Sequence, residues 1–247
     1  MKHAIYIHIP FCRHRCAYCD FNTYAGLESY MASYMDALGK ELTSLAGQVP
    51  GEICTIFLGG GTPSLVPIPM LKTLMDQIQG CFELTDEAEI TLEANPGTVS
   101  PEYLEQLHGM GFNRLSMGMQ SASPDDLRIL ERTHDFVDVV HAVTWARQSG
   151  FENINIDLIF AIPYQTMASW EKTLAHAIHL EVDHLSVYSL ILEHGTPMNA
   201  WVERGLLSPP DEDLAADMFA YAREQLPRAG FDQYEICLLY TSDAADE

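Results

Sequence analysis

Basic residues are scarce in this chain of 247 residues, which has 13 Lys and Arg side chains against 35 Asp and Glu. The formal net charge is −22 at pH 7. Nucleic-acid backbones and anionic membrane surfaces are polyanions, so this balance disfavours both as partners. Such a charge also keeps a protein soluble, which is its more ordinary consequence. We therefore expect no nucleic acid among the partners.

Long apolar runs are also lacking. No stretch approaches the ~20 apolar residues that a membrane helix needs. The apolar run over residues 4–9 is too short for a secretory signal, and Pro10 and the cysteines follow it directly. We therefore expect no transmembrane segment and a cytoplasmic location.

Cysteine is too rare and too unevenly placed for a disulfide scaffold. The chain has six, and Cys54, Cys81 and Cys237 are scattered without a pairing pattern. This usage suits a reducing cytoplasm and a metal site. The other three, Cys12, Cys16 and Cys19, lie within eight residues.

This triplet is the strongest chemical signal in the chain. Thiolates at such spacing can converge on a soft metal centre. A [4Fe–4S] cluster normally takes four cysteines, so three would leave one iron open to bind a substrate. The alternatives are a zinc site closed by His8 or His14, a disulfide, or unrelated buried cysteines. The spacing favours the iron–sulfur cluster.

The hydrophobic pattern predicts strands that alternate with helices. Such alternation is typical of parallel strands joined by right-handed crossovers, and 247 residues fit one α/β barrel. The predicted strands cover 4–9, 53–58, 89–93, 114–120, 153–159 and 184–190. The predicted helices cover 28–48, 69–80, a segment from Pro101 capped by Ser100, a segment from Pro124 capped by Ser123 with Asp125 and Asp126 in its first turn, 136–149, a segment around 170–178, and 211–229. The pattern predicts an α/β fold, an open partial (β/α)6 barrel.

Polar and apolar residues alternate in the third, fourth and fifth predicted strands. Side chains alternate faces along a strand, so one face must be apolar, toward the helices, and the other polar, toward the barrel interior. A closed barrel usually fills its interior with Val, Ile and Leu, so polar side chains here favour a cavity. Glu93, Gln120 and Asp157 stand near the carboxyl ends of these strands. A ligand pocket explains three such residues better than separate capping or loop contacts.

Four segments carry a resemblance to a known family. They are Tyr6-Ile7-His8-Ile9-Pro10-Phe11-Cys12, Asp20-Phe21-Asn22, Gly59-Gly60-Gly61-Thr62-Pro63 and Leu92-Glu93-Ala94-Asn95-Pro96. With the cysteine triplet they resemble the radical S-adenosylmethionine (SAM) superfamily. Within it they are similar to the branch of the oxygen-independent coproporphyrinogen III oxidases and the HemW-type heme chaperones. The resemblance covers residues 1 to about 236 and independently implies a partial barrel.

The resemblance implies two cofactors and their ligands. A [4Fe–4S] cluster would bind Cys12, Cys16 and Cys19, and its open iron would chelate SAM and deliver one electron, giving a 5′-deoxyadenosyl radical. By the same resemblance the amino-acid end of SAM would meet the segment Gly59, Gly60, Gly61 and Thr62. Its polar groups would meet Glu93, Gln120, Arg132 and Asp157. Tyr18 would pack near the adenine, and Tyr6 would contact the cofactor from beneath.

One residue separates the two functions that the branch offers. The oxidases have a further cysteine two places after the third ligand, where this chain has Phe21. The resemblance therefore implies a heme chaperone that takes heme as cargo, serves client hemoproteins and needs a reduced electron donor. The alternative is the oxidase, which converts two propionates of coproporphyrinogen III to vinyl groups. A structural zinc protein would not explain the glycine run or the polar strand faces.

Two further departures, and an unidentified heme ligand, limit what the resemblance implies. Ala161 stands where the family usually has glycine. We expect residues 1–236 to form the radical SAM core, and residues 237–247 to be a non-native tail in place of the family's C-terminal domain. The heme ligand is not identified, because nine histidines are conceivable: His3, His8, His14, His134, His141, His176, His179, His184 and His194.

Overall fold

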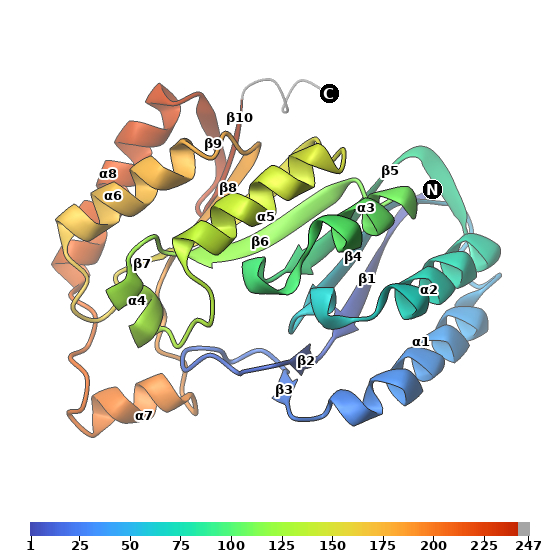
Figure 1. Cartoon of the computed structure of the whole chain (residues 1–247), viewed down its shortest axis with the longest axis horizontal. Helices are drawn as coiled ribbons and strands as arrows, with labels where there is room; N and C mark the ends of the chain where they lie inside the picture. The colour runs from blue at the N-terminus through green and yellow to red at the C-terminus, as the bar shows by residue number, and fades with distance from the viewer. Residues whose placement is uncertain (242–247) are drawn as a thin grey trace.

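The computed structural model describes residues 1–241 and has one main sheet in which six parallel strands lie in sequence order (Figure 1). Two antiparallel strands extend it beyond β8, and the order β1-β4-β5-β6-β7-β8-β10-β9 leaves β1 and β9 as unjoined edges. The sheet is therefore open, as the α/β partial-barrel prediction requires. The strands are β1 (Lys2–Ile9), β4 (Glu52–Gly60), β5 (Glu83–Ala94), β6 (Arg114–Gln120), β7 (Asn153–Phe160), β8 (His184–Ser189), β9 (Phe231–Glu235) and β10 (Leu238–Thr241).

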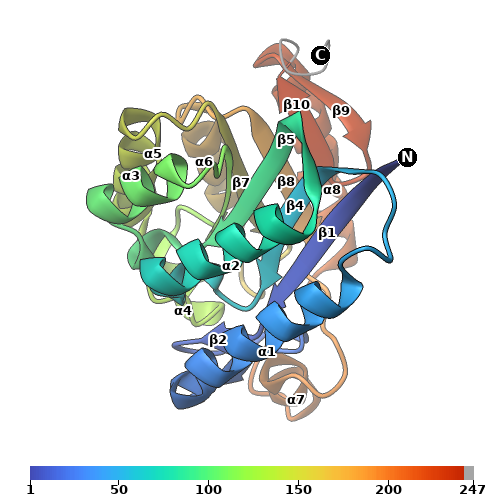
Figure 2. The ribbon, with the colours of Figure 1, turned by 90° about the vertical axis from the view of Figure 1, so that its right-hand side faces the viewer.

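Helices follow the parallel strands and cover one side of the sheet (Figures 1 and 2). Several begin with the caps that their sequences predict: the Ser100 and Ser123 side chains accept hydrogen bonds from backbone N–H groups of the first turns, and a proline follows each. None of the helices in residues 1–241 is long and apolar enough to cross a membrane. They are α1 (Met31–Leu45), α2 (Ile68–Cys81), α3 (Pro101–Gly109), α4 (Pro124–Ile129), α5 (Phe136–Gln148), α6 (Met167–Ile178), α7 (Pro197–Glu203) and α8 (Glu212–Arg228).

The core lies between the sheet and these helices. The apolar members of the alternating strands, such as Leu92, Met117 and Ile156, are completely buried there. Trp170 on α6 is also completely buried, and its indole N–H donates to the carbonyl of Met218 on α8. Burying apolar area of this kind is the main force that holds the helices on the sheet.

The other face of the sheet is polar, as the alternation predicts. Asn155 on β7 is at the centre of a hydrogen-bonded row: its amide donates to Ser116 on β6, and its oxygen accepts from Ser186 on β8 and contacts His184. Paired residues of parallel strands point to the same face. The row therefore lines the concave side and leads toward the strand ends.

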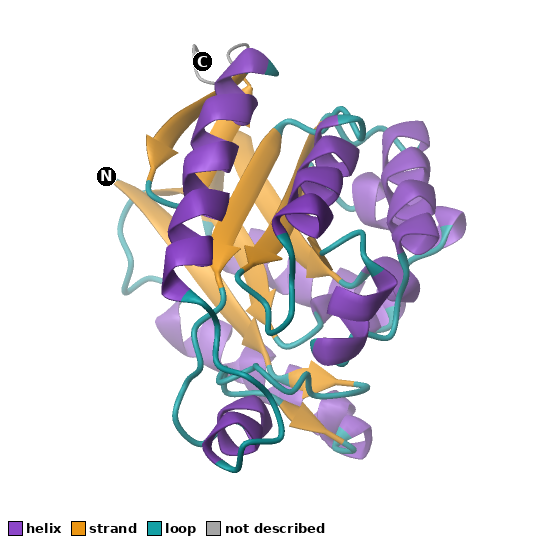
Figure 3. Ribbon diagram, turned by 90° about the vertical axis from the view of Figure 1, so that its left-hand side faces the viewer, coloured by secondary structure: helices purple, strands orange, loops and turns teal. Residues whose placement is uncertain are grey.

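The carboxyl ends of the parallel strands meet at one end of the molecule, where α4, α7 and the cysteine loop also lie (Figures 2 and 3). The loop is held by a short parallel pair, β2 (Phe11–Cys12) with β3 (Tyr24–Ala25). The backbone N–H of Tyr24 also donates to the carbonyl of Pro10 at 2.8 Å. These contacts fold the cysteine segment back over the strand ends.

The elements differ from their predicted bounds in a few places. Strand β5 begins six residues before the predicted strand at 89, and the predicted helix over 28–48 divides into a 3₁₀ turn at Glu28–Tyr30 and the helix α1. Helix α7 and strands β2, β3, β9 and β10 were not predicted. Residues 238–241 of the expected non-native tail form β10, and residues 242–247 lie outside the described residues.

Candidate functional site

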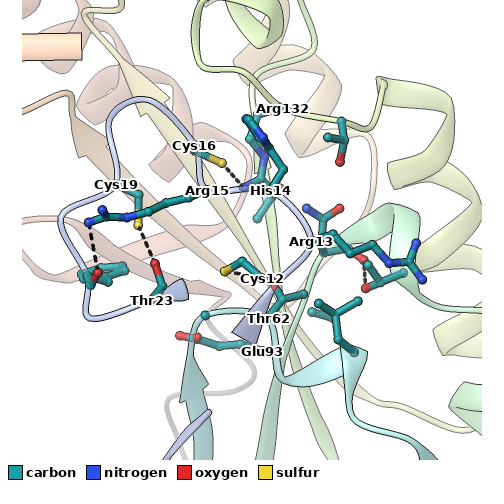
Figure 4. Close-up of a pocket in the computed structure, with 18 of the residues that line it drawn as sticks. Cys12, Arg13, His14, Arg15, Cys16, Cys19, Thr23, Thr62, Glu93 and Arg132 are labelled. Atoms are coloured by element: carbon teal, nitrogen blue, oxygen red, sulfur yellow. Dashed lines mark hydrogen bonds between the residues drawn. The ribbon is translucent and has the colours of Figure 1, made fainter. Parts of the chain in front are cut away.

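A cavity of about 350 Å³ opens at the carboxyl ends of the parallel strands. The cysteine loop forms one wall, and the ends of β4, β5, β6 and β7 form the others (Figure 4). Barrel enzymes build their active sites at this end of the strands. Eleven of the thirteen predicted site residues line it: Cys12, Cys16, Tyr18, Cys19, Gly60, Gly61, Thr62, Glu93, Gln120, Arg132 and Asp157.

The three cysteines of the loop are free thiols distributed around this cavity (Figure 4). Each has a different polar neighbour. The Thr62 hydroxyl donates to Cys12 Sγ at 3.5 Å, the Arg132 guanidinium donates to Cys16 Sγ at 3.5 Å, and Cys19 Sγ lies 3.8 Å from the Thr23 hydroxyl. The triplet is therefore not a disulfide and not three unrelated core residues.

The donor set also bears on the zinc alternative. A structural zinc site needs four ligands that converge on one ion. In residues 1–241 no group of three or more His, Cys, Asp and Glu side chains is arranged to hold a single metal ion. Three separate thiols around one cavity fit a cluster of several irons, each of which takes one thiolate.

The glycine run joins strand β4 to the cysteine loop. The N–H of Gly61 donates to the Ile9 carbonyl and that of Thr62 to the Phe11 carbonyl, both at 2.8 Å. A Cβ on Gly61 would lie 2.7 Å from the Phe11 carbonyl oxygen. Gly60 has φ of +114°, a conformation that side chains rarely allow. This segment must therefore be glycine for the two backbones to approach.

Two carboxyl groups, Glu93 on β5 and Asp157 on β7, face the cavity from the two strands that flank β6. Glu93 accepts a hydrogen bond from the Gly60 N–H at 2.9 Å. Burial raises the pKa of Glu93 to about 7; Gly60 and Arg114 oppose the rise, and Asp157 adds to it. The pKa of Asp157 is raised as well, chiefly by burial, although Asn155 donates to its carboxylate at 2.8 Å. Buried carboxyl groups of this kind favour a cationic ligand.

Arg132 supplies a positive charge between these acids and the loop. Burial lowers the pKa of Arg132, but Tyr18 and Cys16 raise it by more. The net pKa is therefore raised, and the guanidinium stays charged. It donates to the Gly118 carbonyl at 2.9 Å, while its buried Nε has no hydrogen-bond partner. A buried donor without a partner favours an acceptor from a ligand, and a guanidinium suits a carboxylate.

Gln120 reaches the cavity through an unusual backbone. Its φ is +65°, in the left-handed region. A Cβ on Gly118 would lie 2.5 Å from the amide nitrogen of Gln120, so glycine at that place makes room for the side chain. Ala161 also has positive φ, +59°, which explains why glycine would suit that position better.

The structure does not bring Tyr6 and Gly59 into the cavity wall. Tyr6 stacks on Phe57 with ring centroids 6.1 Å apart, and its hydroxyl is hydrogen-bonded to His8. Gly59 lies behind Glu93, because a Cβ there would be 3.0 Å from the Glu93 carboxylate. Its absence of a side chain therefore makes space for Glu93.

Other residues in the cavity wall were not predicted from the sequence. Arg13 and Arg15 stand between the first two cysteines, so their position was a signal that could have been used. Thr23, Asn95, Thr98 and Ser116 come together only through tertiary contacts.

This geometry agrees with a family comparison. The model of the radical SAM superfamily matches residues 6–177. The chain belongs to the radical SAM superfamily. The matched residues include the cysteine loop, the glycine run and the ends of β4 to β7, so the family relationship covers the cavity just described.

Similar proteins and structures lie in the expected branch. The chain is 38% identical over 237 residues to the heme chaperone HemW of Mycobacterium tuberculosis and 40% identical over 238 residues to that of Bacillus subtilis. These alignments cover 94% and 96% of this chain but 61% and 62% of the relatives. A solved structure described as coproporphyrinogen III oxidase (HemN) from Escherichia coli, a radical SAM enzyme, matches with TM-score 0.90 and 29% identity over 97% of this chain and 56% of that one.

Proposed function

We propose that this cavity holds a [4Fe–4S] cluster on Cys12, Cys16 and Cys19, with SAM beside it. Three thiols around one cavity supply one ligand fewer than the cluster has irons. That leaves one iron for SAM, and the family membership supports the pair of cofactors. The chemistry that these groups supply when bound is the one-electron cleavage of a carbon–sulfur bond of SAM.

The chain's own residues bind and orient SAM in this proposal. The carboxylates of Glu93 and Asp157 attract its cationic groups, and the free Nε of Arg132 offers a donor to its carboxylate. The backbone of Gly60 and Gly61 provides close approach at the end of β4. Tyr18 lies against Arg132 and excludes water from that side.

Heme binding and transfer to client hemoproteins is the function that we favour. The single observation that carries it is Phe21, which stands in the cavity wall where the oxidases have a further cysteine. A phenyl ring cannot ligate metal or take part in thiol chemistry. The similarity to proteins named heme chaperone HemW supports the same choice.

The alternative is an oxygen-independent coproporphyrinogen III oxidase. It is favoured by the high structural similarity to the Escherichia coli oxidase, with TM-score 0.90. A fold shared so closely does not by itself decide the reaction, because function depends on the site. The residue at position 21, which is Phe in this chain and Cys in the oxidases, is therefore the more informative difference.

The two functions are separated by one experiment. The chain is reconstituted with iron and sulfide without oxygen, and supplied with reductant and SAM. One sample receives coproporphyrinogen III, and the other receives heme followed by an apo-cytochrome. We expect heme uptake and transfer, with no protoporphyrinogen.

Protoporphyrinogen formed at a catalytic rate would overturn the chaperone proposal in favour of the oxidase. Absence of both heme uptake and decarboxylation by a chain with full cluster content would contradict both functions. A Phe21→Cys variant in the same assay tests whether a thiol at residue 21 is sufficient to introduce decarboxylation.

A further inference from the structure

A second apolar cluster lies at the cavity end of the molecule, apart from the main core. Its buried members come from the cysteine loop, the end of α4, the end of β7 and the segment that follows β8. They are Ala17, Leu130, Ile159, Ile162, Leu190 and Met198. None of these six belongs to the main core between the sheet and the helices. This second cluster therefore supports the cavity end specifically.

Three members of the second cluster are close chain neighbours of residues that bind the cofactors in the proposed function. Ala17 directly follows Cys16, Leu130 stands two places before Arg132, and Ile159 stands two places after Asp157. Met198 differs from them, because it comes from α7 (Pro197–Glu203), which contributes no residue to the cavity wall. The Met198 side chain is completely buried all the same.

A backbone hydrogen bond also joins α7 to the cysteine loop. The N–H groups in the first turn of a helix have no partner within that helix. The Thr196 hydroxyl accepts one such N–H, and Pro197 has no N–H to donate. The Met198 N–H donates to the carbonyl of Ala17 at 3.0 Å. The acceptor stands between the second and third cysteines of the loop.

The middle of the cysteine loop depends on contacts of this kind. The β2–β3 pair fixes the two ends of the loop. Between them the Cys19 N–H donates to the Cys16 carbonyl at 3.1 Å and closes a turn. Such a bond fixes the shape of the turn but not its place over the strand ends. Ala17 fixes that place, because its side chain is buried in the second cluster and its carbonyl is bound to α7.

We propose that Met198 is a positioning residue for the cluster and SAM. Its side chain fills the second cluster and its N–H holds the Ala17 carbonyl, so α7 sets the place of the turn that carries Cys16 and Cys19. The inference rests on the cofactors proposed above and adds a residue that lies outside the cavity wall. Residues that support metal ligands from behind typically contribute about 10- to 100-fold to metal affinity or activity.

The test compares two completely buried methionines. Met198→Ala removes the side chain from the second cluster, and Met218→Ala, on α8, removes one from the main core. Met198→Leu is the conservative variant, because it keeps the volume of the side chain. The urea midpoint of each cluster-free chain measures stability. After anaerobic reconstitution, iron release to bathophenanthroline disulfonate, SAM affinity, and the paramagnetic signal of the reduced cluster with and without SAM measure the site.

We expect Met198→Ala to release iron about tenfold faster and to bind SAM about tenfold more weakly than the unmodified chain. The change that SAM causes in its paramagnetic signal should also differ from that of the unmodified chain, because the turn that carries two cluster ligands has moved. Met198→Leu should restore all three. Met218→Ala should lower the urea midpoint, because it leaves a void in the main core, and should keep the iron release and SAM affinity of the unmodified chain.

Unchanged iron release and SAM affinity in Met198→Ala would overturn the positioning role. Equal losses in Met218→Ala would overturn it too, since any buried methionine would then have the same effect. A folded Met198→Ala chain that assembles no cluster, beside a Met218→Ala chain that does, would support the role. If Met198→Ala does not fold, Met198→Val and Met218→Val give the same comparison with smaller voids. An unmodified chain that assembles no cluster would contradict the proposed cofactor, which is a different failure.

Discussion

Arg132 donates to the thiol sulfur of Cys16 at 3.5 Å, although 116 positions separate the two residues. The same guanidinium donates to the carbonyl of Gly118 on β6 at 2.9 Å. One side chain therefore ties the cysteine loop, which follows β1, to the opposite half of the cavity. The contact places a charged hydrogen-bond donor beside one of the three proposed cluster ligands.

We predict that Cys12→Ala, Cys16→Ala and Cys19→Ala each prevent assembly of a [4Fe–4S] cluster. Each thiol lies on a different part of the cavity wall, so no other cysteine can replace it. Iron analysis and the absorbance of the anaerobically reconstituted chain measure the effect. Cys81→Ala, in α2 and outside the cavity, is the control and should retain ~4 irons per chain. Full iron content in all three loop variants would rule out this ligand set.

We predict that SAM binding weakens as pH falls through about 7. The pKa of Glu93 is raised to about 7 by burial, so its carboxylate, which attracts the cationic groups of SAM, becomes neutral below that pH. Equilibrium titration of SAM between pH 6 and 8 measures the change. Glu93→Gln should bind SAM about tenfold more weakly at pH 8, a loss of ~1.4 kcal/mol, and should show less pH dependence. The same pH profile in both proteins would assign the titration to another group.

The same group makes an opposite contribution to folding. The folded-state pKa of Glu93 lies above its ordinary 4.5, so the folded chain holds the proton more tightly than the unfolded chain. Stability from this group is present below pH 4.5 and is lost as pH rises through about 7. Glu93→Gln should therefore be more stable than the unmodified chain at pH 8, as urea midpoints would measure.

Gly61→Ala should destabilise the chain by about 2 kcal/mol, because the new Cβ would meet the Phe11 carbonyl at 2.7 Å and must displace backbone. Gly80→Ala is the matched control. Its Cβ would meet nothing within 4 Å, and alanine favours a helix over glycine by up to ~1 kcal/mol. Urea midpoints should move in opposite directions. Two similar shifts would show that the close approach at Gly61 is not rigid.

The sequence predicted those parts of the site that depend on local periodicity. Glu93 and Asp157 were identified because side chains alternate along a strand and parallel strands share a carboxyl end. The free cysteines and the glycine run were identified by spacing and family resemblance. The placement of Tyr6 could not be predicted, because its neighbours on the sheet, Phe57 and His8, decide where its ring lies.

Contacts between segments that are distant in the sequence could not be predicted from sequence patterns. The sequence presents Asp125 and Asp126 as equivalent acids in the first turn of a helix. In the structure Asp125 is exposed, while Asp126 is 3% exposed and accepts from Ser121, Gln165 and Ser169. Two of these donors, Gln165 and Ser169, lie 39 and 43 positions away, so only their tertiary contacts with Asp126 distinguish the two acids.

This difference gives a matched pair of variants. Asp126→Ala should destabilise the chain by about 3 kcal/mol, because it leaves several buried donors without an acceptor. Asp125→Ala should cost less than about 1 kcal/mol, since its ion pair with Arg128 is exposed. Urea unfolding of the cluster-free chain measures both.

The same pair tests whether this network supports the cavity. Ser121, which donates to Asp126 at 2.8 Å, directly follows Gln120, whose φ of +65° must be maintained for its amide to reach the cavity. A residue with a positive φ keeps that conformation only when its surroundings fix it. We therefore expect Asp126→Ala to weaken SAM binding under conditions where the chain is still folded, and Asp125→Ala to leave it unchanged. Equal SAM affinity in the two folded variants would show that Gln120 is held by its own strand and not by the buried acid.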